Sequence, residues 1–220
     1  MTSLRPQAAG LYDPNFEHDA CGVGAVASLT GERSHSTVER ALHVLDHLEH
    51  RGASGAEADT GDGAGILLQL PDRFLRDEVD FELPEEGRYA VGVCFLPKDE
   101  GKRAEAEHTI EQTIADHGQT LLGWRDVPVD STVPGASAAA VEPRIRQVFV
   151  GSTLADDVHA ADDLAFERKI YVIRRVIEKS VPEEDLAIPS FSARTIVYKG
   201  MLTSPQLPDY FPELRDERMV

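Results

Sequence analysis

The chain has 220 residues, 41% of them hydrophobic, which is enough for one large domain or two small ones with a sizeable core. It carries 39 acidic against 22 basic residues, a formal net charge of −17, which argues against nucleic acid and anionic membranes as partners because both attract basic surfaces. No apolar run approaches the roughly 18 residues of a membrane span, and residues 1–20 lack the apolar core of a signal peptide, so we expect a cytoplasmic protein.

Lysine is scarce in this chain, whereas arginine and aspartate are plentiful. An acidic, lysine-poor surface suits a high-salt cytoplasm, where ions screen the repulsion between like charges. An ordinary acidic protein has the same composition, so a halophilic and an ordinary interpretation both stay open.

The N-terminal part of the sequence predicts a leader, a strand and a helix. Residues 1–20 are polar and broken by prolines, as in a leader or propeptide, and residues 21–29 predict a buried strand. Ser36, with Glu39 three residues later, fits a capping box. The apolar residues that follow have helical spacing, and this helix is expected to end near Gly52.

The remainder of the chain predicts a single mixed domain of strands and helices. Residues 131–141 are expected to form a surface loop, and the tail from residue 204 to 220 shows no recognisable element. Apolar patterns predict strands over residues 66–70, 88–96, 119–127, 145–150 and 190–202, and helices over residues 100–117 and 164–180.

Cys21 is the first candidate for chemistry. If the chain is cut before Cys21, this residue gains a free α-amino group, whose ordinary pKa of roughly 7.7–8.0 allows it to act as the base for its own thiol. The alternative is a small structural cysteine. The other cysteine, Cys94, lies within a predicted apolar strand and is expected to be an inert core residue.

A glycine-rich stretch from residue 50 to 65 joins the first helix to the next strand. Such glycines let the backbone approach a ligand or another backbone segment closely. The triplet Asp59-Thr60-Gly61 matches that of aspartic proteases, but it lacks the apolar strand before it and a second copy. The run Gly61-Asp62-Gly63-Ala64-Gly65 leads into a strand and is not followed by Lys-Ser/Thr, so it is no phosphate-binding loop.

Histidines raise the question of a metal site. His43, His47 and His50 fall at helical spacing, but no cysteine or carboxylate pattern completes a zinc-binding arrangement. We therefore predict no metal site and expect solvated histidines on a helix face.

Three stretches together carry a family resemblance. They are Glu17-His18-Asp19-Ala20-Cys21-Gly22-Val23-Gly24, then His50-Arg51-Gly52-Ala53 with Asp59-Thr60-Gly61-Asp62-Gly63-Ala64-Gly65-Ile66, and then Ser192-Ala193-Arg194-Thr195-Ile196-Val197-Tyr198-Lys199-Gly200-Met201. In this order they resemble the N-terminal amidotransferase domain of glutamate synthase large subunits. The resemblance covers essentially the whole chain from about Tyr12 onward.

The resemblance implies a class II glutamine amidotransferase of the N-terminal-nucleophile type. Its fold would be α+β, a four-layer αββα sandwich over residues 21–220 that is incomplete at the C-terminus, preceded by a propeptide of residues 1–20. Cys21 would attack the side-chain amide of L-glutamine and release ammonia, and the thioester would be hydrolysed to glutamate. Arg51 and Gly52 inherit the substrate-binding role of the family's His-Arg-Gly segment.

The resemblance also implies a larger enzyme, in which the ammonia reacts with 2-oxoglutarate to give glutamate. This chain itself would hold no cofactor, whereas FMN and an iron–sulfur cluster are expected in the full-length enzyme. The expected partners are the remaining synthase domains and a small subunit or ferredoxin.

One departure from the family concerns length. The family's Arg-Phe-Ser-Thr-Asn segment, which binds the glutamine carboxylate, and its Asn-Gly-Glu segment, which supplies the oxyanion hole, would both lie beyond Val220. Loss of an oxyanion donor typically costs roughly 10²–10³ in rate. The expectation is therefore a weakly active or inactive chain. The alternatives are a fragment that depends on a partner and another N-terminal-nucleophile amidotransferase, such as one of purine or glucosamine synthesis; the Asp59 to Gly65 run and Tyr198-Lys199-Gly200-Met201 favour the synthase.

Overall fold

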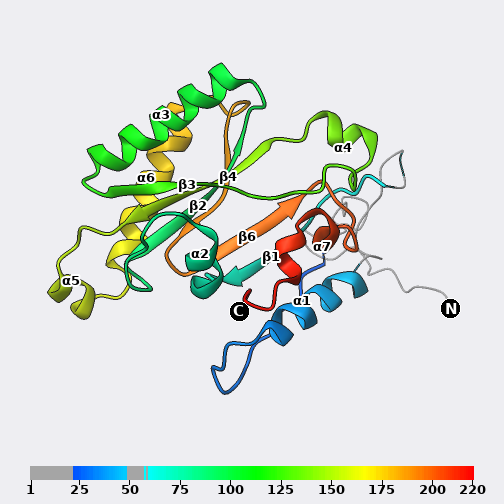
Figure 1. Cartoon of the computed structure of the whole chain (residues 1–220), viewed down its shortest axis with the longest axis horizontal. Coiled ribbons are helices and arrows are strands. Elements are labelled where there is room, and N and C mark those ends of the chain that lie inside the picture. The colour runs from blue at the N-terminus through cyan, green and yellow to red at the C-terminus, as the bar shows by residue number, and fades with distance from the viewer. Residues whose placement is uncertain (1–21, 49–56, 58) are drawn as a thin grey trace, which may run out of the picture.

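Two antiparallel sheets form the centre of the molecule in the computed structural model, which describes residues 22–48, 57 and 59–220 (Figure 1). One sheet has four strands in the order β3-β4-β2-β5, and the other pairs β1 with β6. The strands are β1 (Ala64–Gln69), β2 (Tyr89–Leu96), β3 (Thr120–Asp126), β4 (Arg144–Gly151), β5 (Ala187–Ser192) and β6 (Thr195–Gly200).

Strand β2 lies inside the four-stranded sheet and is buried on both faces. Tyr89 and Val91 point into the core between the two sheets, whereas Ala90 and Cys94 belong to the core under the outer helices. Burial on both faces explains why its sequence is a continuous apolar run and does not alternate. Cys94 is a fully buried thiol, as predicted, and burial raises its pKa to about 12.

Helices cover the outer face of the four-stranded sheet, and a further helix packs against the core that contains β1. Helices α3 (Glu100–Asp116) and α6 (Ala165–Ser180) pack on the four-stranded sheet through apolar side chains such as Ile110 and Ile170. Helix α1 (His35–His47) lies at the opposite side of the molecule, and its Val38 packs into the core that contains β1 (Figure 1). The predicted α+β class is confirmed by the two antiparallel sheets and the helices that pack on them.

Two predicted strands differ from the structure. Residues 22–28 form no regular element and pair with no described strand, and Val23 is 93% exposed, so the strand predicted from residue 21 to 29 is not formed by the described part of that segment. The strand predicted over residues 190–202 is two strands in different sheets. At the bend between them the Ser192 hydroxyl oxygen accepts hydrogen bonds from Arg194 N and Thr195 N.

The helical predictions hold with small changes at their ends. Helix α1 is capped by Ser34, whose side chain accepts from Ser36 N, so the capping box predicted at Ser36 is wrong. The predicted helix end near Gly52 lies outside the described residues. Helix α3 ends as expected before Gly118, which has a φ of +69°.

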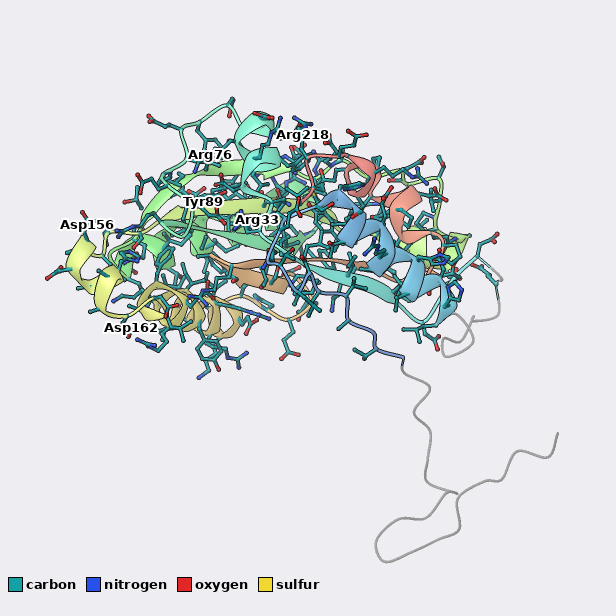
Figure 2. The ribbon with its side chains drawn as sticks, turned by 90° about the horizontal axis from the view of Figure 1, so that it is seen from below. Arg33, Arg76, Tyr89, Asp156, Asp162 and Arg218 are labelled. Atoms are coloured by element: carbon teal, nitrogen blue, oxygen red, sulfur yellow. The ribbon has the colours of Figure 1, made fainter. Side chains whose placement is uncertain are left out.

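The tail, which showed no recognisable element in sequence, is an ordered part of the core. It forms α7 (Leu207–Tyr210) and the 3₁₀ helix η3 (Pro212–Arg215). Arg218, labelled in Figure 2, donates to Asp77 and Glu78 of α2 (Asp72–Glu78). Three further short helices were not predicted from the sequence. They are α2, α4 (Ala136–Ala140), which lies in the predicted surface loop, and α5 (Asp156–Ala161).

A buried polar network joins the tail to both sheets. Glu213 accepts from Arg125 Nη2 at 2.7 Å and from the Tyr198 hydroxyl at 2.5 Å. Arg125 also donates to Gln147 Oε1 at 3.0 Å. Burial, together with the nearby Glu213 carboxylate, raises the pKa of Tyr198 well above its ordinary value, so this hydroxyl stays protonated and donates.

Replacement of Glu213 by alanine would remove the carboxylate that is hydrogen-bonded to the buried Arg125 guanidinium and leave it only the Glu78 carboxylate, 3.9 Å from Nη2. We expect Glu213→Ala to lower the free energy of unfolding by about 3–5 kcal/mol. Glu86→Ala is the control, because it breaks the exposed pair with Arg33, whose loss is expected to cost less than about 1 kcal/mol. Urea unfolding followed by circular dichroism measures both, and equal small losses would contradict a structural role for the network.

Candidate functional site

Two of the three sequence motifs meet in the two-stranded sheet. Strand β1 pairs with β6 in antiparallel register, with Ala64 opposite Gly200 and Ile66 opposite Tyr198. The glycine-rich run that leads into β1 therefore lies beside the end of β6. This is the pair of motifs that carried the resemblance together with the segment around Cys21.

The three predicted site residues, Cys21, Arg51 and Gly52, lie outside the residues that the structure describes. Their described neighbours in sequence pack together. A Cβ added to Gly24 would come within 2.3 Å of Val44 Cγ1 and 3.8 Å of Leu48 Cδ1, both on helix α1 or its C-cap. The segment that follows Cys21 thus lies against the end of the helix that precedes Arg51.

The glycine-rich loop, which we define as residues 59–63, approaches another backbone segment closely. A Cβ on Gly61 would lie 2.3 Å from Leu202 O and 2.7 Å from Thr203 N. Gly63 has a φ of +138°, a conformation that side chains other than hydrogen disfavour. The prediction that these glycines permit close backbone contact is confirmed, and the contact at Gly61 is with the chain itself.

Two neighbouring segments hold the glycine-rich loop through hydrogen bonds. Glu57 accepts from Ser137 N at 3.1 Å and from Thr60 Oγ1 at 3.0 Å, and these bonds lower the pKa of its carboxyl group. The Asp59 carbonyl accepts from Gly135 N at 2.9 Å. The loop is therefore fixed against α4 and the residues before it.

A cavity of about 490 Å³ lies between the end of β2, the starts of β4 and β5, the end of β6 and helix α4. Leu202, which contacts Gly61 of the loop, is part of its wall. Its lining is mostly apolar, with Lys98, Glu142, Lys199 and Tyr210 among the polar residues. Such a lining suits a small ligand that has both aliphatic and polar parts. No serine, threonine, cysteine or histidine is among the described residues that line this wall.

Glu142 is the most strongly held polar group in that wall. It accepts from Lys98 Nζ at 2.9 Å, Tyr210 OH at 3.0 Å and Ser131 Oγ at 3.0 Å. Burial alone would raise the pKa of this carboxyl group, but the three hydrogen bonds outweigh it and lower the pKa. Glu142 therefore stays ionised at neutral pH and anchors α7 against the cavity.

Within the described residues, no group of three histidine, cysteine, aspartate or glutamate side chains is arranged to hold a metal ion. His43 and His47 lie edge to face with ring centroids 4.3 Å apart, and His47 Nδ1 is 2.8 Å from the His43 carbonyl oxygen. Among all the residues that the structure describes, no helix has the length and hydropathy needed to cross a membrane.

Glu57, Glu142 and Gln206 contact this site but were not singled out from the sequence. Gln206 lies in the tail, where Leu207, Tyr210 and Leu214 recur at a spacing of three and four residues. That spacing was the one available sign that the tail packs as a helical segment. The two glutamates are single acidic residues in an acidic chain, and no pattern distinguishes them.

Comparison with known proteins gives a consistent result. The family profile described as glutamine amidotransferases class-II matches residues 21–220. The chain is 45% identical over 98% of its length to a glutamate synthase (NADPH) large chain of Bacillus subtilis. It is 38% identical over 95% of its length to a glutamate synthase (NADH) of Saccharomyces cerevisiae, and 39% identical over 98% to ferredoxin-dependent glutamate synthase 1 of Arabidopsis thaliana. It spans only 14%, 10% and 13% of these relatives.

The contact at Gly61 yields a direct test of the loop's packing. We expect Gly61→Ala to lower the free energy of unfolding by about 1–3 kcal/mol, because the added methyl group must displace backbone atoms. Gly101→Ala is the control, since Asp99 Oδ1 at 3.4 Å is its only close neighbour and alanine is favoured in helix α3. Thermal unfolding of both variants measures the difference, and an unchanged midpoint for Gly61→Ala would contradict the close approach.

Proposed function

We propose that this chain is the glutaminase part of a glutamate synthase. The proposal starts from its family, because the chain belongs to the class II glutamine amidotransferases. The observation that carries the proposal is the extent of the family match, which runs from residue 21 to residue 220 and begins at Cys21. A match that starts at a cysteine supports removal of residues 1–20 as a propeptide. Cys21 then becomes the first residue of the mature chain.

In the proposed reaction, the α-amino group of Cys21 takes the thiol proton and the sulfur attacks the side-chain carbonyl carbon of L-glutamine. The carbon–nitrogen bond breaks, and the proton passes to the leaving nitrogen, which departs as ammonia. Water then attacks the thioester carbonyl, which releases glutamate and restores the thiol. An amine with an ordinary pKa near roughly 8 is suited to both proton transfers at neutral pH.

Arg51 and Gly52 are proposed to bind the substrate beside Cys21. Support comes from the packing of their described neighbours, since Gly24 lies against Leu48 at the end of α1. Cys21 precedes Gly24 by three residues, and Arg51 follows Leu48 by three. The glycine-rich loop and the adjacent cavity lie where β1 and β6 begin and end, and are proposed to shape the rest of the site.

In the whole enzyme we propose that the ammonia is used to convert 2-oxoglutarate to glutamate. The relatives carry names that specify NADPH, NADH or ferredoxin, and all match this region at 38–45% identity. We therefore propose that the electron donor is recognised outside the region that this chain matches. FMN and an iron–sulfur cluster are proposed for those other parts, with the remaining synthase domains and a small subunit or ferredoxin as partners.

The proposed exposure of Cys21 is tested by the intact mass of the expressed protein. We expect the wild type to lose residues 1–20 and Cys21→Ala to keep them, because the thiol takes part in its own release. Cys94→Ser is the control and should be processed like the wild type. Release of glutamate from glutamine, measured on the same samples, should require Cys21; processing or glutamate release by Cys21→Ala would sink the proposal.

A second proposal is that this unit needs a partner surface for activity, and exposed apolar side chains favour it. Leu67 on the outer face of β1 is 64% exposed, and Met201 and Val141 at the cavity rim are 52% and 67% exposed. Among the described residues, β1 and β6 form a sheet of two strands. A two-stranded sheet with an uncovered apolar face is stabilised when another segment packs on it.

Size-exclusion chromatography over a range of concentrations tests this second proposal. We expect the wild type to self-associate as the concentration rises, and Leu67→Lys to shift it toward the monomer. Leu164→Lys, which changes an exposed leucine next to α6, is the control and should leave the association unchanged. A wild type that stays monomeric and unfolds cooperatively at every concentration would count against a partner-dependent unit.

A further inference from the structure

A segment of the tail spans the glycine-rich loop and is fixed at its far end inside the core. We call residues 203–216 the strap. At its start, Leu202 O and Thr203 N lie against Gly61 so closely that a Cβ would not fit. Near its end, Glu213 is buried between the sheets and bound by Arg125 and Tyr198.

Gln206 is the residue of the strap that holds the loop. Its Nε2 donates to Asp59 O at 3.0 Å and to Val133 O at 2.9 Å, and its Oε1 accepts from Thr203 N at 2.9 Å. One side-chain amide thus joins the loop, the segment before α4 and the strap. Only an amide supplies two donors and an acceptor in this geometry, so no charged or apolar residue replaces it without loss.

The glycine-rich loop depends on such contacts from outside. Residues 59–63 belong to no helix and precede β1. Glycine gives this backbone a conformational freedom that it must lose on ordering. The Asp59 carbonyl accepts two hydrogen bonds, from Gln206 Nε2 and from Gly135 N. Loss of the Gln206 donor therefore removes the hydrogen bond that joins the loop to a side chain of the strap.

We propose that Gln206 is a positioning residue, which sets the glycine-rich loop in the geometry required for glutamine hydrolysis at Cys21. This role rests on the proposed function. Gln206 acts through the Asp59 backbone carbonyl, and it places the loop beside β6 and the cavity. The anchor at Glu213 gives the strap a fixed position from which Gln206 reaches the loop.

The first arm of the test measures the loop directly by amide hydrogen exchange. In Gln206→Glu, whose carboxylate cannot donate to Asp59 O, we expect exchange in residues 59–65 to rise at least tenfold while β2 is unchanged. Gln206→Met removes the donors without adding charge and should act alike. Gln112→Glu is the matched control, because its amide donates to Asp116 on the exposed face of α3. Unchanged exchange in residues 59–65, or an equal rise in β2, would overturn the proposal.

The second arm measures alkylation of Cys21 by iodoacetamide, with site-resolved mass spectrometry. Cys94 is fully buried and serves as the internal reference for folding. We expect Cys21 of the wild type to react faster in the native chain than in urea, and Gln206→Glu to lose at least fivefold of that native rate with Cys94 still protected. A native rate equal to that in urea would count against the proposed function alone. A fast wild type with an unaffected Gln206→Glu would overturn the positioning role alone.

Discussion

The buried contact between Glu213 and Arg125 is the constraint on which the arrangement of this molecule depends. Their side chains are 4% and 8% exposed, so neither charge is left to water. Removal of two ions from water carries a desolvation penalty. Their attraction offsets this penalty only when their geometry is fixed and their remaining hydrogen-bonding atoms are satisfied. Tyr198 and Gln147 complete that set, and the network ties β3, β4, β6 and the tail together.

The same contact explains how a loop without regular structure keeps one position. Tyr198 belongs to β6, and β6 pairs with β1, into which the glycine-rich loop leads. Glu213 holds the strap, and the strap reaches the loop through Gln206. The Glu213 carboxylate is thus connected to the loop in two ways. One connection runs through Tyr198 and the β6–β1 pairing, and the other runs through the strap and Gln206. A glycine-rich segment gains much of its order from its surroundings, because glycine has no side chain that could pack or form hydrogen bonds.

The sequence predicted the elements whose apolar residues repeat and missed those whose order comes from distant contacts. β2, α3 and α6 were predicted because each buries a continuous run or a helical stripe. Residues 22–28 are as apolar as a strand but have no ladder partner, and pairing is a property of the whole sheet. The break of residues 190–202 into β5 and β6 depends on Ser192, whose hydroxyl turns the chain from one sheet to the other.

For the site, sequence motifs indicated which segments matter but not what holds them. The adjacency of the glycine-rich run and the Tyr198 to Met201 segment follows from the β1–β6 register, which neither motif encodes alone. Gln206 contacts a carbonyl 147 positions earlier in the chain, a distance over which no local pattern carries information. Every residue has a backbone carbonyl, so a side chain that donates to one does not require a particular residue type as its partner. The sequence therefore shows no sign of such a contact. Residues of this kind are found from the fold, whereas a nucleophile such as Cys21 is identified by its own chemistry.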